Sequence, residues 1–158
     1  MLFKRKESVK DYCTFKLVHL LSEDTDAKWE AFRRSCNDPC LTEADGTVYS
    51  NNMCAASLTL MFIAITRNSK LGVGSDARDF VYGWLNHRGL SENASLCDEY
   101  RRAFGSSPVD GVRAMAFRFA EKVAGPGFKS ATAEAFCDYF YVVLRGLFDE
   151  FKSIKLEV

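Results

Sequence analysis

Two cysteines near position 40 come closest to the spacing of a metal site. Cys36 and Cys40 flank a turn in the segment CNDPC, where two thiolates would supply half of a zinc ligand set. A structural zinc needs four ligands, usually as two close pairs, and the sequence holds no CxxC or HxxxH pair to complete it. The two histidines, His19 and His87, lie far from this turn and from each other in the sequence. We therefore expect no metal.

The segment before a predicted helix near position 75 resembles part of a dinucleotide-binding turn. Gly72, Gly74 and Ala77 form G-x-G-x-x-A, whose glycines would let a pyrophosphate approach a helix N-terminus. That motif requires a strand immediately before it, whereas the preceding apolar run is rich in Ala, Leu and Met and is followed by the polar segment TRNSK. We interpret the segment as a loop and a helix cap without a cofactor. A bound anion at the Ser75 end is a less demanding alternative, since a helix N-terminus attracts negative charge.

No arrangement for catalysis is visible in the sequence. The chain contains no G-x-S-x-G, no HExxH and no Glu-x-x-His, and His87 near a helix C-terminus is explained by the helix dipole alone. An enzyme is thus the third hypothesis, after two non-catalytic ones. If the chain is an enzyme with a spatially assembled site, we would look first at Tyr49, Asn52, His87 and Arg88.

Length and charge favour one globular domain. The 158 residues suffice for a single domain, which we place at 1–158, and surface scaling predicts that about 69% of the chain's surface is buried on folding. The 21 basic residues are balanced by 21 acidic residues, which removes the main physical reason to expect nucleic-acid binding. Residues 1–7 (MLFKRKE) are charged and lack the apolar stretch of a secretory signal, so we expect a flexible basic extension and a cytoplasmic protein.

The apolar residues recur at helical spacing almost everywhere, which predicts an all-α fold. The stretch MCAASLTLMFIAI, residues 53–65, is apolar on nearly every side but too short to span a bilayer. It predicts a central helix at about 48–68, with a start as early as Thr42, surrounded by the other helices. The remaining helices are expected at about 8–21, 24–36, 75–88, 92–104, 107–125 and 130–154. About seven helices joined by short loops predict a compact bundle.

Three helix boundaries carry specific signals. Ser8 with Asp11 three residues on resembles a capping box, and Arg88-Gly89-Leu90 predicts a Schellman motif with glycine in the left-handed conformation. Ser107 followed by proline predicts a serine N-cap with proline at the first helical position.

The last predicted helix is unusually aromatic. Its segment FCDYFYVVLRGLF is apolar over more than one stripe, so another element, a second subunit or a ligand must cover some of that surface. Our first functional hypothesis is therefore a non-catalytic interaction module that binds a protein partner or forms a homodimer. Its interface candidates are Phe136, Tyr139, Phe140, Tyr141 and Phe148.

The second hypothesis is a helical bundle that binds a small apolar or aromatic ligand. Its pocket candidates are Tyr49, Met53, His87 and Arg88. An interaction module predicts an exposed apolar patch, whereas a ligand-binding bundle predicts a cavity with a few convergent polar groups.

Overall fold

The computed structural model describes residues 8–22, 27, 30–31, 33–34, 46–68, 73–107, 109–124 and 133–152. Within these ranges the chain forms six helices and no strand, so the all-α prediction is confirmed. The helices are α1 (Val9–Ser22), α3 (Gly46–Asn68), α4 (Val73–His87), α5 (Ser91–Gly105), α6 (Gly111–Ala124) and α7 (Ala133–Lys152).

The count is six helices in the described ranges, where about seven were predicted. The difference concerns the helix expected at 24–36, which lies mostly outside the described residues. Its described members, Ala27, Glu30, Ala31, Arg33 and Arg34, are helical. The basic extension 1–7 and the pair Cys36 and Cys40 also lie outside the described residues.

Two of the three boundary predictions are confirmed by hydrogen bonds. At the start of α1 the amide of Asp11 donates to the Ser8 hydroxyl at 3.2 Å, as an N-cap serine requires. At the end of α4, Gly89 has φ of 73°, and the amides of Leu90 and Gly89 donate to the carbonyls of Leu85 and Asn86 at 2.8 and 3.2 Å. Those two bonds form the predicted Schellman motif.

The predicted start of α6 was wrong by one turn. The helix begins at Gly111, and its cap is Asp110, whose carboxylate accepts a hydrogen bond from the Arg113 amide at 3.1 Å. Ser107 instead accepts a bond from the Asp110 amide at 3.2 Å in the preceding turn. An aspartate is as good a cap as a serine, so this region offered two competing start signals.

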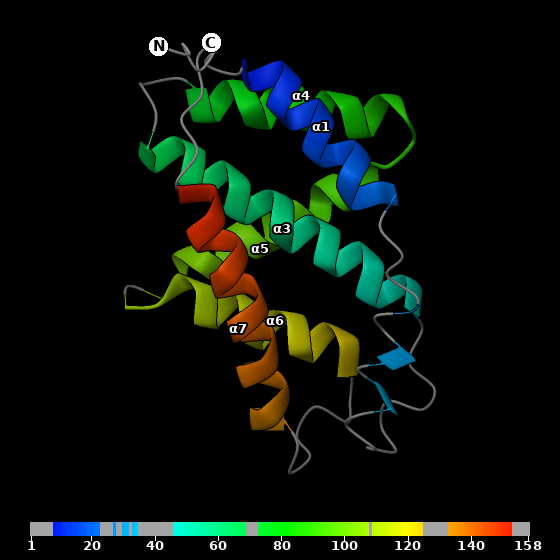
Figure 1. The fold of residues 1–158 in the computed structure, drawn as a ribbon, viewed down its shortest axis with the longest axis vertical. Helices are drawn as coiled ribbons and strands as arrows, with labels where there is room; N and C mark the ends of the chain where they lie inside the picture. Colours follow the sequence, from blue (N-terminus) through cyan, green and yellow to red (C-terminus); the bar gives the residue numbers. More distant parts are fainter. Residues whose placement is uncertain are drawn as a thin grey trace, which may run out of the picture.

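Helix α3 is the centre of the molecule, as the sequence predicts. It packs against α4, α5, α6 and α7, and every residue from Cys54 to Phe62 is buried. In Figure 1, α1 and α4 lie on one side of α3, and α6 and α7 lie on the other. The helix begins at Gly46, between the two starts that the sequence suggested.

Within the described residues, α3 is also the one helix long and apolar enough to cross a membrane. The segment Thr47–Arg67 meets that test by length and composition, but 72% of its most apolar window is buried inside the fold. Burial on all sides by other helices is what the core helix of a bundle requires.

Phe140, a fully buried aromatic residue of α7, packs inward against α3 and α6. The rings of Phe140 and Phe119 lie 4.1 Å apart at 62°, and Tyr49 of α3 meets Phe119 edge to face at 5.7 Å. Edge-to-face pairs add to the stabilisation that area burial provides. This cluster forms a dense aromatic core on one side of α3.

Candidate ligand-binding cavity

A cavity of about 290 Å³ lies where α3, α4 and α5 meet. Its size is just below the usual range of small-molecule sites, about 300 to 1,000 Å³. The described residues that line it come from all three helices: Thr59, Phe62, Ile63, Thr66 and Arg67 of α3, Ser75, Arg78 and Tyr82 of α4, and Cys97 and Arg101 of α5.

Helical periodicity explains why these residues meet. The lining residues of α3 recur at steps of three and four, those of α4 at three and four, and those of α5 at four. Side chains at these spacings share one face of a helix. Each helix therefore turns one stripe toward the cavity while its other faces pack against the core or meet solvent.

One wall of the cavity is apolar. Phe62 is 7% exposed, and its ring meets the Tyr82 ring edge to face at 6.0 Å. Cys97 is 1% exposed, and burial raises the pKa of its thiol to about 12, so the sulfur is protonated at neutral pH. A protonated thiol is a weak nucleophile, and Cys97 acts here as an apolar wall group.

Three of the four hydroxyl groups that line the cavity are held by hydrogen bonds. The Thr59 hydroxyl lies 2.8 Å from the Ala55 carbonyl oxygen, and Thr66 donates to the Phe62 carbonyl at 2.7 Å. The Tyr82 hydroxyl donates to the Asp98 carboxylate at 2.8 Å. Burial, followed by this hydrogen bond, raises the pKa of Tyr82. The Tyr82 phenol is therefore a fixed neutral group at the cavity.

Three arginines supply the charge of the cavity, and none of the described lining residues is acidic. The Arg67 guanidinium lies over the rings of Phe104 and Phe148, 5.1 and 5.8 Å from their centroids. Arg78 and Arg101 form ion pairs of 3.8 Å with Asp79 and Asp98 on their own helices. The cavity thus combines an apolar wall with an excess of positive charge.

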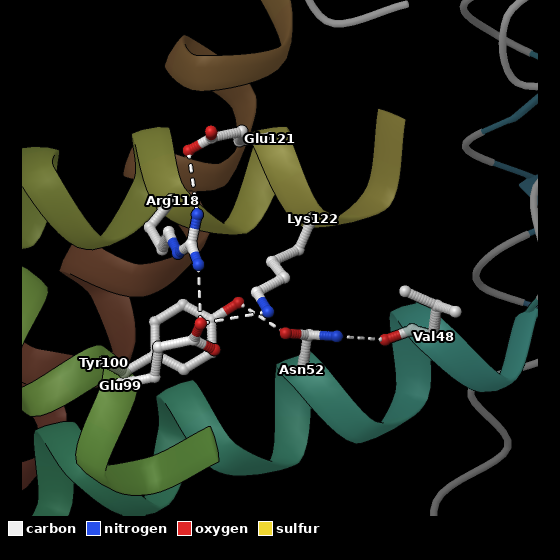
Figure 2. A network of polar contacts seen from close by, with 7 residues as sticks. All are labelled: Val48, Asn52, Glu99, Tyr100, Arg118, Glu121 and Lys122. Atoms are coloured by element: carbon white, nitrogen blue, oxygen red, sulfur yellow. Dashed lines mark hydrogen bonds and ion pairs between the residues drawn. The ribbon is translucent and has the colours of Figure 1, made fainter. Parts of the chain in front are cut away.

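A second polar network links α5 to α3 and α6 and is organised differently (Figure 2). Its buried part joins α5 to α3, because the Tyr100 hydroxyl donates to Asn52 Oδ1 at 2.8 Å and Asn52 Nδ2 donates to the Val48 carbonyl at 2.8 Å. Its outer part joins α5 to α6, where Glu99 accepts from Arg118 at 2.5 Å and pairs with Lys122 at 3.0 Å. These short, closed contacts fasten three helices together.

The four pocket candidates from the sequence do not line this cavity. Tyr49 is 4% exposed within the aromatic core, and Met53 packs partly buried against that core. His87 and Arg88 are exposed at the C-terminal end of α4, where the Arg88 guanidinium lies 3.9 Å from the Trp84 ring centroid. Asn52, named as a catalytic candidate, belongs to the polar network of Figure 2.

The five interface candidates on α7 differ in how far the fold buries them. Phe140 and Phe148 are 0% and 2% exposed in the core, so this chain itself covers them. Tyr141 is half-buried under the Arg113 guanidinium, 4.5 Å from its ring centroid. Tyr139 is 42% exposed, and the side chain of Phe136 lies outside the described part of the chain.

The described ranges show neither a metal-ligand cluster nor a strand before the dinucleotide-like motif. No group of three or more His, Cys, Asp or Glu residues there could hold a metal ion. Gly74 and Ala77 lie within α4, and the element before them is the helix α3, whereas a dinucleotide fingerprint follows a strand. Gly72 lies outside the described residues.

The chain was compared with protein-family models, with curated protein sequences and with solved structures, and none of them matches it. The functional argument therefore depends on the geometry of the chain itself.

Proposed function

We propose that this protein binds a small molecule in the cavity between α3, α4 and α5. The observation that carries the proposal is the convergence of an apolar wall and several polar groups on one cavity of about 290 Å³. Ligand sites are concave and mostly apolar, with a few polar groups that fix the orientation of the ligand. Phe62 and Ile63 would contact the apolar part of the ligand, and the groups of α4 and α5 would contact its polar part.

A titration with uncharged aromatic and aliphatic probes tests this proposal. Benzyl alcohol and 1-hexanol are added to isotopically labelled protein, and the amide resonances are followed by NMR. We expect the shifted resonances to lie on the lining stripes of α3, α4 and α5, and the aromatic core between α6 and α7 to stay unchanged. Saturable shifts elsewhere, or none at all up to millimolar probe, would refute the proposal.

A matched pair of variants locates the binding site. Ile63→Trp places a bulky ring at the cavity wall and should abolish the shifts. Val142→Trp makes a similar change on the outer face of α7, where Val142 is 70% exposed, and should leave binding intact. Thermal unfolding of both variants checks that each remains folded.

A specific observation also supports the interaction module as a second candidate. Tyr139 and Val142, three residues apart on α7, are 42% and 70% exposed. Two neighbouring apolar side chains on one helix face suit a small contact with a second copy of this chain. Light scattering over a range of protein concentrations should then show a dimer that Val142→Glu dissociates. A monomer at every concentration would remove this candidate.

A further inference from the structure

We propose that the ligand of this cavity is a small organic carboxylate, whose charged group is bound by Arg78 and Arg101 and whose compact apolar body lies against Phe62 and Ile63. This inference depends on the proposed function, since it names the chemical class of ligand for the same cavity. What supports it is the unequal charge of the lining, which holds three arginines and, among its described residues, no carboxylate.

Arg78 and Arg101 are the arginines best placed to bind an anion. They come from different helices, α4 and α5, and line the same cavity. Their ion pairs with Asp79 and Asp98 are 3.8 Å long, beyond ordinary hydrogen-bond distance, and in the described part of the chain neither arginine has a shorter ion pair. A guanidinium has five N–H donors that match a carboxylate in a planar, two-point contact. Both arginines therefore retain donors for a ligand.

Arg67 has a different part in this arrangement. Its guanidinium lies over the rings of Phe104 and Phe148, and these cation–π contacts hold it at the α3 end of the cavity. It adds positive potential to the lining while its guanidinium stacks on these two rings. Ser75, in the first turn of α4, adds the positive end of that helix dipole to the lining.

Asp98 favours a ligand with a single negative charge. Its carboxylate accepts the Tyr82 hydroxyl at 2.8 Å and lies 3.8 Å from Arg101, so it offsets part of the positive charge beside the cavity. A dianion such as a phosphate monoester would meet stronger repulsion from Asp98 than a carboxylate would. The small volume of the cavity also suits a compact ligand with one charged group.

Pairs of probes that differ only in charge test the inference. Benzoate is compared with benzyl alcohol, and hexanoate with 1-hexanol, by NMR titration of the full chain at neutral pH and low salt. We expect each carboxylate to bind about tenfold tighter than its alcohol, because it gains charge-assisted hydrogen bonds that the alcohol lacks. This preference should shrink as salt is added.

Arginine variants identify the groups responsible. Arg78→Gln and Arg101→Gln should each remove most of the preference for the carboxylate while benzyl alcohol binds as before. Arg102→Gln is the matched control, because Arg102 is the exposed neighbour of Arg101 on α5 and does not line the cavity. Arg78→Lys keeps the charge but loses the planar contact, so its preference should be intermediate.

The outcomes separate this inference from the proposed function. If the alcohols bind and the carboxylates bind no tighter, the cavity is a ligand site but the anion assignment is overturned. If phenyl phosphate binds tighter than benzoate, the choice of a carboxylate is overturned. If none of the probes shifts the lining resonances, the proposed function fails and this inference fails with it.

Discussion

Helix α5 contributes charged side chains to two regions of the molecule, and their ion pairs differ in length. In the polar network of Figure 2, Glu99 and Tyr100 meet their partners at 2.5 to 3.0 Å. At the cavity, which Cys97 and Arg101 line, the ion pair of Arg101 is 3.8 Å long. Short, closed contacts fix helices in place, whereas donors with long ion pairs remain able to bind something else.

This difference distinguishes polar groups that hold the fold from polar groups that are available for function. A buried polar atom without a partner costs free energy, so a stable fold closes its buried networks. Groups at a partly exposed cavity avoid that cost by contacting water until a ligand replaces it. The experiments below compare matched changes in the two regions, from the largest expected effect to the smallest.

The largest effect is expected in the aromatic core beside the polar network. Phe140→Ala should lower the free energy of unfolding by about 3–5 kcal/mol, because Phe140 is fully buried and its ring lies 4.1 Å from that of Phe119. Val142→Ala, on the exposed face of the same helix, should change stability by less than about 0.5 kcal/mol. Chemical denaturation measures both. A loss below about 1 kcal/mol for Phe140→Ala would show that this side is not densely packed.

The same deletion of a hydroxyl can be made in both regions. Tyr100→Phe should cost about 1–3 kcal/mol, since it leaves Oδ1 of the buried Asn52 without its donor. Tyr82→Phe should cost about 0.5–1 kcal/mol, because the Asp98 side chain is 42% exposed and water can replace the lost donor. Equal losses in urea denaturation would contradict the distinction between a closed network and an open cavity.

Two glycines on α4 and α6, the helices that pack against α5, test packing in opposite directions. A Cβ at Gly111 would lie 2.7 Å from the Phe104 ring, so Gly111→Ala should lower stability by about 1–3 kcal/mol. Gly83, inside α4, has no atom within 4 Å of an added Cβ, so Gly83→Ala should raise stability by about 0.5–1 kcal/mol through helix propensity. Midpoints of thermal unfolding give both signs, and a stabilising Gly111→Ala would show that the α5–α6 contact is loose.

The fold could be predicted from the sequence because its signals are local. The apolar run around residues 53–65 needs burial by neighbouring helices. Gly89 followed by Leu90 specifies a helix C-terminus with the glycine in the left-handed conformation. Where two local signals competed, at Ser107 and Asp110, the prediction chose the wrong one. Both residues are good caps, and the difference between them depends on the tertiary position of the turn.

The cavity could not be predicted, because it depends on how helices pack. Arg67, Arg78 and Arg101 lie on three helices and come together only when α4 and α5 pack on α3. In the sequence each is an ordinary helical arginine, more often solvated than functional. The burial of Phe140 was equally hidden, since an aromatic helix gives no sign of whether the fold or a partner covers it.

The smallest expected effect is the pH dependence of the polar network. Burial raises the pKa of Glu99, but the hydrogen bonds from Arg118 and Lys122 outweigh it and hold that pKa below its usual range. A depressed carboxyl pKa means that the stabilisation is present above the unfolded value, about 4.3, and is lost as the pH falls through the folded value. Denaturation of the wild type at pH 7 and pH 3 should therefore show a loss that Glu99→Gln reduces.

Removing one cation tests the cause of that shift. Lys122→Met deletes the 3.0 Å ion pair and should move the pKa of Glu99 upward, toward its usual range, in an NMR titration of the carboxyl carbon. Arg113→Met removes an exposed arginine that pairs with Asp138 between α6 and α7, and should leave the titration of Glu99 unchanged. If neither variant changed the Glu99 titration, Lys122 would not be a working partner of Glu99. The lowered pKa of Glu99 would then depend on Arg118 alone.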